Sequence, residues 1–320
     1  MSASNLPARA AENLRAAGRS EDTERRSVAS TAVPAEPHAG YRRRFWTRAR
    51  ILRTALAVVF VVVGILMLAP VAWVVVQSVE PASQQFEVPP VWFPHDMTLQ
   101  SYRTLFTDVP FVMNVLNSLL VTTSVVVGAA ITSVLAAYAF ARLEFRGREA
   151  LFVLFLAALT LPSQVEAVPE FVVVKYLHLL NTQASLVFPA LVQVFGIFLL
   201  RQHFRTIPKD LEDSATIDGA GHLAIIRHVM IPLSWPAISA VMIITGQYIW
   251  NDFFWPNLFI ISEGRTTAPL ALYTLQASQG GGPIGAVFAG LSVLCVPMVI
   301  GFIVFQRRLM AGIGYRGVSR

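Results

Sequence analysis

Six long apolar stretches, separated by polar and proline-containing segments, occupy most of the chain. A helix that crosses a bilayer needs about 20 mostly apolar residues. The stretches that meet this length are roughly 53–78, 114–140, 149–172, 184–203, 235–261 and 286–306. Prolines and polar residues interrupt the third and the fifth, so their ends are the least defined. Small residues in the second, GAAITSVLAAYAFA, predict close helix packing. The pattern predicts an all-α polytopic membrane protein with six transmembrane helices.

Residues 1–45 differ in composition from the apolar stretches. They are rich in Ala, Arg, Glu, Ser and Pro and have no apolar periodicity, which is typical of a disordered segment. The run RRRF at 42–45 matches the start of a twin-arginine export signal. The apolar run that follows, at 54–76, is too long for a signal peptide and has no evident cleavage site. We therefore predict a disordered tail over residues 1–45 and an uncleaved first transmembrane helix.

The amount and the distribution of charge support this interpretation. Charged residues make up 14% of the chain, whereas soluble domains carry about 25%. Of the 25 Lys and Arg residues, all but Arg103, Lys175 and Arg265 lie before or at the start of the first stretch, after the last, at the end of the fourth, or in the segments that follow the second and fourth. The positive-inside rule then places both termini in the cytoplasm. The net charge of +6 is thus explained by topology rather than by nucleic-acid binding, and the single Cys295 excludes an internal disulfide.

An acidic segment, DLEDSATIDGAG at residues 210–221, lies between the fourth and fifth apolar stretches. Its first residues, DLED, would place three acids near the positive end of a helix dipole, and Pro208 is compatible with the first turn of that helix. Gly219 and Gly221 are expected to end it. The segment therefore predicts a short acidic helix on the cytoplasmic side.

A second short helix is predicted over residues 222–230, before Pro232 and Pro236, which begin the fifth transmembrane helix. The whole connection then forms two short helices in an L. It is much longer than the roughly 2–8 residues that join neighbouring helices in bundles. A rigid projection of this kind can receive force from a soluble partner. The alternative is a solvated loop whose acids only cap a helix.

The spacing within this connection carries a resemblance. Asp213-Ser214-Ala215 is followed after three residues by Gly219 and after nine more by VMIP at 229–232. This spacing resembles the cytoplasmic loop of ABC importer permeases, in which E-A-A, G and I-x-L-P stand at these positions. Further segments between residues 50 and 320, among them YIWNDFFWPNLFI and FQRRLMAGI, resemble the carbohydrate branch and, within it, the maltose-type second permease subunit.

The resemblance implies the type I ABC importer permease fold over residues 46–320, with a cytoplasmic coupling loop at about 205–235. It implies a multi-pass subunit of the prokaryotic cell membrane, not an enzyme, that takes a di- or oligosaccharide, or a related polyol or glycerol phosphate, across by alternating access. The implied partners are a second homologous permease, two ATPase subunits, an extracytoplasmic solute-binding protein and membrane lipid. The residues implied to dock on the ATPase are Asp210, Asp213, Ser214, Ala215, Asp218, Gly219 and Ala220.

Nucleotide and metal sites are not expected in this chain. The sequence has no G-x-x-x-x-G-K-[ST] loop, whose backbone cradles nucleotide phosphates. ATP and Mg²⁺ are therefore expected on the partner ATPase, and no cofactor is expected here. The six His residues are scattered, and no Cys lies near His222 or His228, so no metal site is expected.

Polar residues in the third and fifth stretches are candidates for a translocation path, because charges within a bilayer are costly and mark paths or pairs. A third helix broken between Pro162 and Pro169 can line a water-filled cavity, and the aromatic and polar residues of WNDFFWP suit a sugar. The candidates are Gln164, Glu166, Gln247, Asn251, Asp252 and Trp255. The alternatives are an interfacial position, which is preferred for Glu170, and an aromatic belt at the headgroups.

Two functions of other classes are also compatible with the sequence. An ion-coupled secondary transporter would use Glu166 or Glu170 as its proton carrier and would need no ATPase. A membrane-embedded enzyme acting on lipid-linked sugar would use the same two residues as an acid and a base. Their spacing of four residues is, however, what any helix face provides.

Overall fold

The computed structural model describes residues 39–85, 96–278 and 284–314. The described residues form helices, turns and loops, with no β-strand among them. Two compact units are distinguished, Met1–Met67 and Leu68–Arg320.

The first unit contributes the beginning of α2 (Ala39–Ser78), which corresponds to the first predicted transmembrane helix. Residues 1–38 of the predicted tail lie outside the described residues. The final part of that tail, from Ala39 to Phe45, is helical, so α2 begins well before the apolar stretch at residue 53. The basic residues that precede the apolar stretch therefore belong to the same helix as that stretch.

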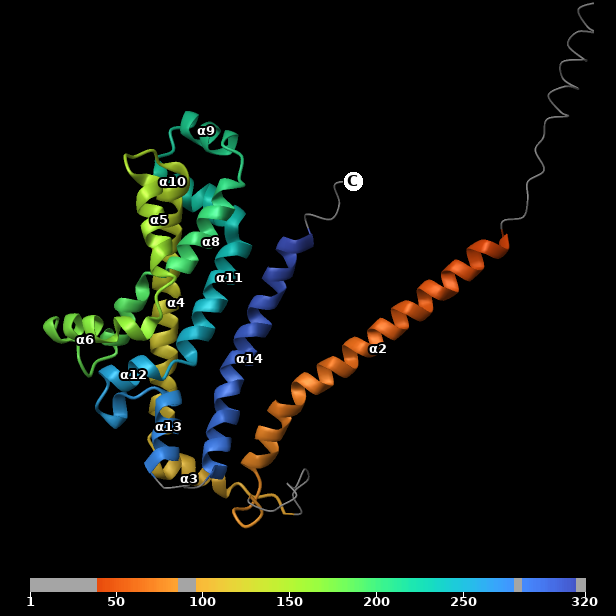
Figure 1. Cartoon of the computed structure of the whole chain (residues 1–320), viewed down its shortest axis with the longest axis vertical. Coiled ribbons are helices and arrows are strands. Elements are labelled where there is room, and N and C mark those ends of the chain that lie inside the picture. Colours follow the sequence, from red (N-terminus) through yellow and green to blue (C-terminus); the bar gives the residue numbers. More distant parts are fainter. Residues whose placement is uncertain (1–38, 86–95, 279–283, 315–320) are drawn as a thin grey trace, which may run out of the picture. The chain divides into compact units, whose positions relative to one another are not determined.

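The second unit is a bundle of helices of very different lengths (Figure 1). Its longer helices are α3 (Gln100–Asp108), α4 (Phe111–Arg142), α5 (Arg148–Ala158), α6 (Ala167–Tyr176), α8 (Val194–Arg205), α9 (Asp210–Ile217), α11 (Ile231–Trp250), α12 (Phe254–Phe259), α13 (Ala268–Ser278) and α14 (Ile284–Gly314). Its short helical turns are η1 (Ser163–Glu166), α7 (Ala184–Val187), η2 (Pro189–Leu191), α10 (His222–Ile225), η3 (Ile226–Met230) and η4 (Glu263–Arg265).

Four described segments are long and apolar enough to cross a membrane, and they match the first, second, fourth and sixth predicted helices. They are Arg53–Ser78, Phe111–Arg142, Ala184–Arg205 and Ile284–Gly301. Two further pairs of helices meet the same test only if each bent pair counts as one crossing. The described residues therefore provide four to six crossings.

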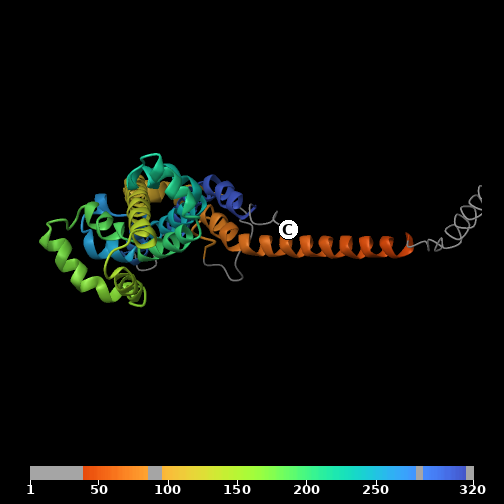
Figure 2. The ribbon, with the colours of Figure 1, turned by 90° about the horizontal axis from the view of Figure 1, so that it is seen from above.

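The third predicted crossing, at 149–172, is not one straight helix. α5 and the segment Ser163–Tyr176 are bent by 97° at the break between them. Pro162 at this break is extended (φ −62°, ψ 131°). Proline lacks the N–H that a helix interior needs, so it favours a position outside the helix. Both views show α6 turning away from α4 and α8 (Figure 1 and Figure 2). The predicted break of this stretch is present, but it lies at residues 159–162 and not between Pro162 and Pro169.

The fifth predicted crossing, at 235–261, is also corrected. It begins earlier, at Ile231, and α11 ends at Trp250, after which the backbone leaves the helix until α12 begins at Phe254. A sharp bend separates the second short helix from the crossing, because His222–Leu233 and Trp235–Trp250 are bent by 82°. The bend lies between Pro232 and Pro236, as expected for residues that disrupt helical hydrogen bonding.

Helix α4 is the centre of the second unit. One face carries the buried residues Val121, Val125, Ala129 and Ala137, which pack against α8, α11 and the segments around α7 and α12. Another face exposes large apolar side chains, among them Val112, Leu116, Leu120, Val127 and Ile131. A helix that is apolar on all sides is typical of a membrane span. The two buried alanines also confirm the predicted packing role of the small residues.

Gly196 marks the closest approach of α8 to α4 and α11, and it gives the first prediction. A Cβ at this position would lie 2.7 Å from Ser133 Oγ and 2.9 Å from Val241 Cγ1. We expect Gly196→Leu to destabilise the assembled protein by about 1–3 kcal/mol through overpacking, measured as a lowered thermal unfolding temperature in detergent. Gly64→Leu is the control, because no described atom lies within 4 Å of a Cβ there. Equal unfolding temperatures for the two variants would contradict the close packing.

Candidate functional site

The acidic segment forms a helix that begins and ends through local interactions. α9 follows Pro208 and Lys209 and has acids throughout its first turn. At its end Gly219 adopts φ +83°. The Gly219 N–H donates to Thr216 O at 3.0 Å, and the Ala220 N–H donates to Ala215 O at 2.9 Å. This is the Schellman pattern, which requires a left-handed residue that glycine adopts at low cost.

Only one of the two glycines ends α9. Gly221 is extended (φ −77°, ψ 169°) and precedes α10 instead. α10 continues through the π-helical turn η3 into α11 without a break in helical backbone. We call residues 210–230 the acidic elbow.

Glu212 is the acid that the sequence analysis did not distinguish from its neighbours. It is buried, whereas the other acids of α9 are exposed. Its Oε1 lies 2.6 Å from Arg142 Nε at the end of α4, and the two side chains are 11% and 7% exposed. Arg142 also donates to the carbonyls of Phe204 at 2.8 Å and Ile207 at 2.6 Å. The ion pair therefore joins α9 to α4 and to the end of α8.

The second half of the elbow is held by apolar packing. Ile225, Ile226 and Met230 are buried in a core cluster together with residues of α4, α8 and α11. The Tyr138 hydroxyl of α4 also lies 3.1 Å from His222 Nδ1, in hydrogen-bonding distance. Both helices of the acidic elbow are therefore fixed to the rest of the second unit.

The predicted docking residues lie on or near the exposed side of the elbow. Five are exposed: Asp210, Asp213, Ser214, Asp218 and Gly219. Ala215 and Ala220 are half-buried against the core cluster below. The structure adds apolar side chains that the sequence analysis did not single out, Leu211, Ile217 and Leu223, which are 44%, 86% and 74% exposed. The surface therefore combines acids with unusually exposed apolar groups.

A second buried arginine holds the neighbouring α4–α5 connection. Arg201 of α8 is 3% exposed, and its guanidinium donates to both Glu149 carboxylate oxygens at 2.7 Å. It also donates to Phe140 O at 3.1 Å and lies 3.8 Å from the centre of the Phe152 ring. Nη2 alone contacts both carboxylate oxygens, and the guanidinium lies over the Phe152 ring, a stacking contact that its planar shape favours.

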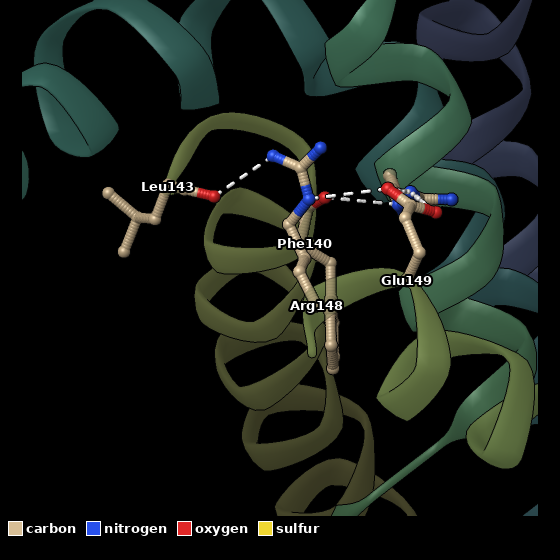
Figure 3. A network of polar contacts seen from close by, with 5 residues as sticks. Phe140, Leu143, Arg148 and Glu149 are labelled. Carbon is tan, nitrogen blue, oxygen red and sulfur yellow. Dashed lines mark hydrogen bonds and ion pairs between the residues drawn. The ribbon is translucent and has the colours of Figure 1, made fainter. Parts of the chain in front are cut away.

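Arg148, the first residue of α5, completes this network. It donates to Leu143 O at 3.0 Å and lies 3.2 Å from Glu149 Oε1 (Figure 3). The sequence analysis interpreted these arginines only as markers of topology. In the structure they also tie the beginning of α5 to α4 and α8.

All six candidate path residues line two adjoining clefts. The first cleft, of ≈ 490 Å³, includes Glu166, Asp252 and Trp255. The second, of ≈ 510 Å³, includes Gln164, Gln247, Asn251, Asp252 and Trp255. The two share Ser163, Tyr248, Asp252 and Trp255, and we call them together the polar cleft.

The breaks in the third and fifth predicted helices create this polar cleft. The turn η1 carries Gln164 and Glu166, while the loop after α11 carries Asn251 and Asp252. Asp252 Oδ1 accepts the N–H groups of Phe254 at 2.9 Å and Trp255 at 3.4 Å, which caps the beginning of α12.

A clamp around Asn181 holds one wall of the cleft in place. Asn181 has φ +57°, and its N–H donates to Phe259 O at 2.8 Å. Its Oδ1 accepts the N–H groups of Ile261 at 3.1 Å and Ser262 at 3.0 Å. The segment after α6 is therefore bound to the segment after α12.

The aromatic residues of the cleft differ in their surroundings. Trp255 stacks on Phe259, with ring centres 5.5 Å apart, and meets Phe254 edge-on at 5.2 Å. Tyr248 is 53% exposed and lines both clefts. The sequence analysis missed Tyr248, although its position four residues before Asp252 was a signal. Glu170, assigned to the interface, also lines the first cleft.

Membrane-length helices, two broken crossings that form a polar cleft, and a projecting elbow together define a multi-pass solute permease. Residues 128–311 match the family described as "Binding-protein-dependent transport system inner membrane component". The chain belongs to this family.

Relatives of known function agree with this assignment. The arabinooligosaccharides transport system permease protein AraQ of Halalkalibacterium halodurans is 31% identical over 84% of this chain and 97% of its own length. The sulfoquinovosyl glycerol transport system permease protein SmoH of Agrobacterium fabrum is 30% identical over 81% of this chain and 93% of its own length.

A solved structure shares the fold. It is a chain of a bacterial ABC transporter involved in the import of the acidic polysaccharide alginate, with a TM-score of 0.68 at 23% identity, over 81% of this chain and 96% of that chain. The prediction of an ABC importer permease fold is thus confirmed. The chain is a multi-pass transport subunit of the bacterial plasma membrane and not an enzyme. Nothing in these comparisons supports the ion-coupled alternative.

Proposed function

We propose that this chain carries a carbohydrate across the plasma membrane as one permease subunit of an ATP-driven importer. The solute is a di- or oligosaccharide or a related polyol or glycerol phosphate. The names of the relatives, which refer to arabinooligosaccharides and sulfoquinovosyl glycerol, support this class of solute. The observation that carries the proposal is the acidic elbow, which exposes acids and apolar groups while a buried ion pair fixes it to α4.

The complex that we propose contains a second homologous permease, two ATPase subunits and an extracytoplasmic solute-binding protein. The family's dependence on a binding protein supports the last of these. ATP and Mg²⁺ bind on the ATPase chains. The surplus of basic residues on one side supports a cytoplasmic position for both termini and for the acidic elbow.

The docking surface is formed by the predicted residues Asp210, Asp213, Ser214, Ala215, Asp218, Gly219 and Ala220. Their charges suit basic groups on the ATPase, and the exposed Ile217 and Leu223 suit an apolar groove. When ATP binding moves the ATPase subunits, the ion pair between Glu212 and Arg142 transmits the movement to α4. The second half of the elbow continues directly into α11.

α11 links the elbow to the polar cleft. It follows the elbow directly, and Gln247 and Tyr248 in its last turn line the cleft. α4 reaches the same cleft through Val121. Movement of the elbow therefore changes the walls of the cleft, which is the geometric requirement of alternating access around a central site.

Cysteine crosslinking tests the docking surface. In a Cys295→Ser background, Asp213→Cys and Ala220→Cys are expected to crosslink to an ATPase chain in intact membranes. Asp108→Cys is the control, because this residue is exposed on α3, far from the elbow in sequence and on the predicted outer side. Mass spectrometry of the crosslinked product identifies the partner. If neither elbow variant captures an ATPase while both are expressed and inserted, the proposed function is wrong.

A further inference from the structure

The charged groups of the polar cleft all have the same sign. Glu166, Glu170 and Asp252 line the first cleft, and Asp252 also lines the second. Among the described residues, neither Lys, Arg nor His lines either of these clefts. The cleft is therefore negative, although the chain as a whole carries a net charge of +6.

The carboxylates are not neutralised by this chain. Glu166 and Glu170 form no side-chain hydrogen bond or ion pair with the residues that the structure describes. Asp252 uses Oδ1 for the backbone N–H groups that begin α12. Glu170, Glu166 and Asp252 line the same cleft. The three groups therefore act together on a solute in the cleft.

A buried hydroxyl in the same wall independently indicates a ligand. Thr267 is 5% exposed and lines the first cleft. Its Oγ1 has no hydrogen-bond partner among the described residues, although buried polar groups are nearly always paired. The Oγ1 is itself covered in this structure, and a small opening of the wall would expose it to a solute hydroxyl. Gln164, Gln247 and Tyr248 add further hydrogen-bonding groups, and Tyr248 and Trp255 add aromatic faces.

We propose that the polar cleft binds uncharged or amino-substituted oligosaccharides and rejects those that carry carboxylate, sulfonate or phosphate groups. This inference rests on the proposed function and narrows its solute class: it excludes glycerol phosphates and also sulfonates, such as the sulfoquinovosyl glycerol in the name of SmoH. Carboxylates accept hydrogen bonds from sugar hydroxyls and attract ammonium groups. An anionic solute would meet three carboxyl groups and no basic group in a site of reduced dielectric, where repulsion from an ionised carboxylate is much stronger than in water.

Binding of trisaccharides of different charge to the assembled permease–ATPase complex tests the proposal. The probes are maltotriose and N-acetylchitotriose (uncharged), chitosan trimer (cationic) and trigalacturonate (anionic), and the readout is intrinsic tryptophan fluorescence in nanodiscs without binding protein. We expect an uncharged or cationic probe to bind at least about tenfold more tightly than trigalacturonate, since a nearby like charge shifts an equilibrium by one or more powers of ten. Trigalacturonate binding as well as or better than the other probes would overturn the proposal.

Neutral variants identify the responsible groups. Glu166→Gln with Glu170→Gln is expected to strengthen trigalacturonate binding about tenfold and to weaken binding of the uncharged probes by less, because the Gln amide oxygens still accept hydrogen bonds from sugar hydroxyls. Glu144→Gln, an exposed carboxylate outside the cleft, is the control and should change neither. A double variant that weakens all probes equally would assign these residues a structural role and contradict the proposal.

Different outcomes would contradict the importer function and the solute preference of the polar cleft. If elbow cysteines crosslink to the ATPase but none of the probes binds, the chain is an importer permease whose polar cleft is not a carbohydrate site. If the crosslinks fail, the proposed function itself is wrong, whatever binds in the cleft.

Discussion

Replacing Arg142 by Ala is expected to destabilise the protein strongly and to uncouple the elbow from α4. Removing one partner of a buried ion pair typically costs about 3–5 kcal/mol, because the other charge remains buried. Here the loss also leaves the carbonyls of Phe204 and Ile207 without their arginine donor. We expect a clearly lowered unfolding temperature and the loss of ATPase stimulation by the solute-loaded binding protein.

Two matched variants separate charge from packing. Arg148→Ala removes an arginine whose ion pair is 30% and 60% exposed, and exposed pairs contribute about 0–1 kcal/mol. Arg142→Met with Glu212→Leu removes both buried charges, and it should regain much of the lost stability, since apolar replacements of buried pairs are often neutral or stabilising. If Arg142→Ala unfolds at the same temperature as Arg148→Ala, the ion pair does not anchor the elbow.

Replacing Gly219 by Val is the second large-effect change, and it is expected to impair coupling more than folding. A Cβ at Gly219 would meet no described atom within 4 Å, so the effect comes from the backbone. At φ +83° a side chain costs about 1–2 kcal/mol, and a β-branched side chain is poorly tolerated. We expect the turn after α9 to change conformation and to shift α9 by about an ångström or more. Transport and binding-protein-stimulated ATPase activity should then fall at least about tenfold.

Gly147 provides a control with the same local geometry. It has φ +84° with no described atom within 4 Å of a Cβ, but it lies in the α4–α5 connection. Gly147→Val should therefore destabilise the protein to a similar degree with much less effect on coupling. Gly219→Asn should recover most of the activity, because Asn tolerates this region of φ. Equal transport by Gly219→Val and the unaltered protein would show that the turn has no part in force transfer.

The elements that the sequence predicted best are those with local causes. The limits of α9 follow from Pro208 before it, the acids in its first turn and Gly219 after it, and all of these act over a few residues. The same holds for the long apolar helices, because lipid requires internal backbone hydrogen bonding over a fixed length. The break at Pro162 also has a local cause, although its angle of 97° depends on the surrounding packing.

The residues next to it in the sequence do not determine the role of each polar residue. Asp210, Glu212 and Asp213 look equivalent in the sequence, yet only Glu212 is buried, because Arg142 meets it from α4, 70 residues earlier. Thr267 and Tyr248 were missed for the same reason. Their significance depends on which distant segments form the cleft.

The sequence by itself determined four of the long apolar helices, the charge asymmetry between the segments that join the apolar stretches and the acidic helix between the fourth and fifth stretches. These follow from hydropathy, backbone sterics and residue spacing, which operate within one segment. Only the tertiary structure decided that Glu212 faces Arg142 and that the broken helices bring Glu166 and Asp252 to one cleft. Such contacts join segments far apart in the chain, and their energies depend on burial, which periodicity does not specify.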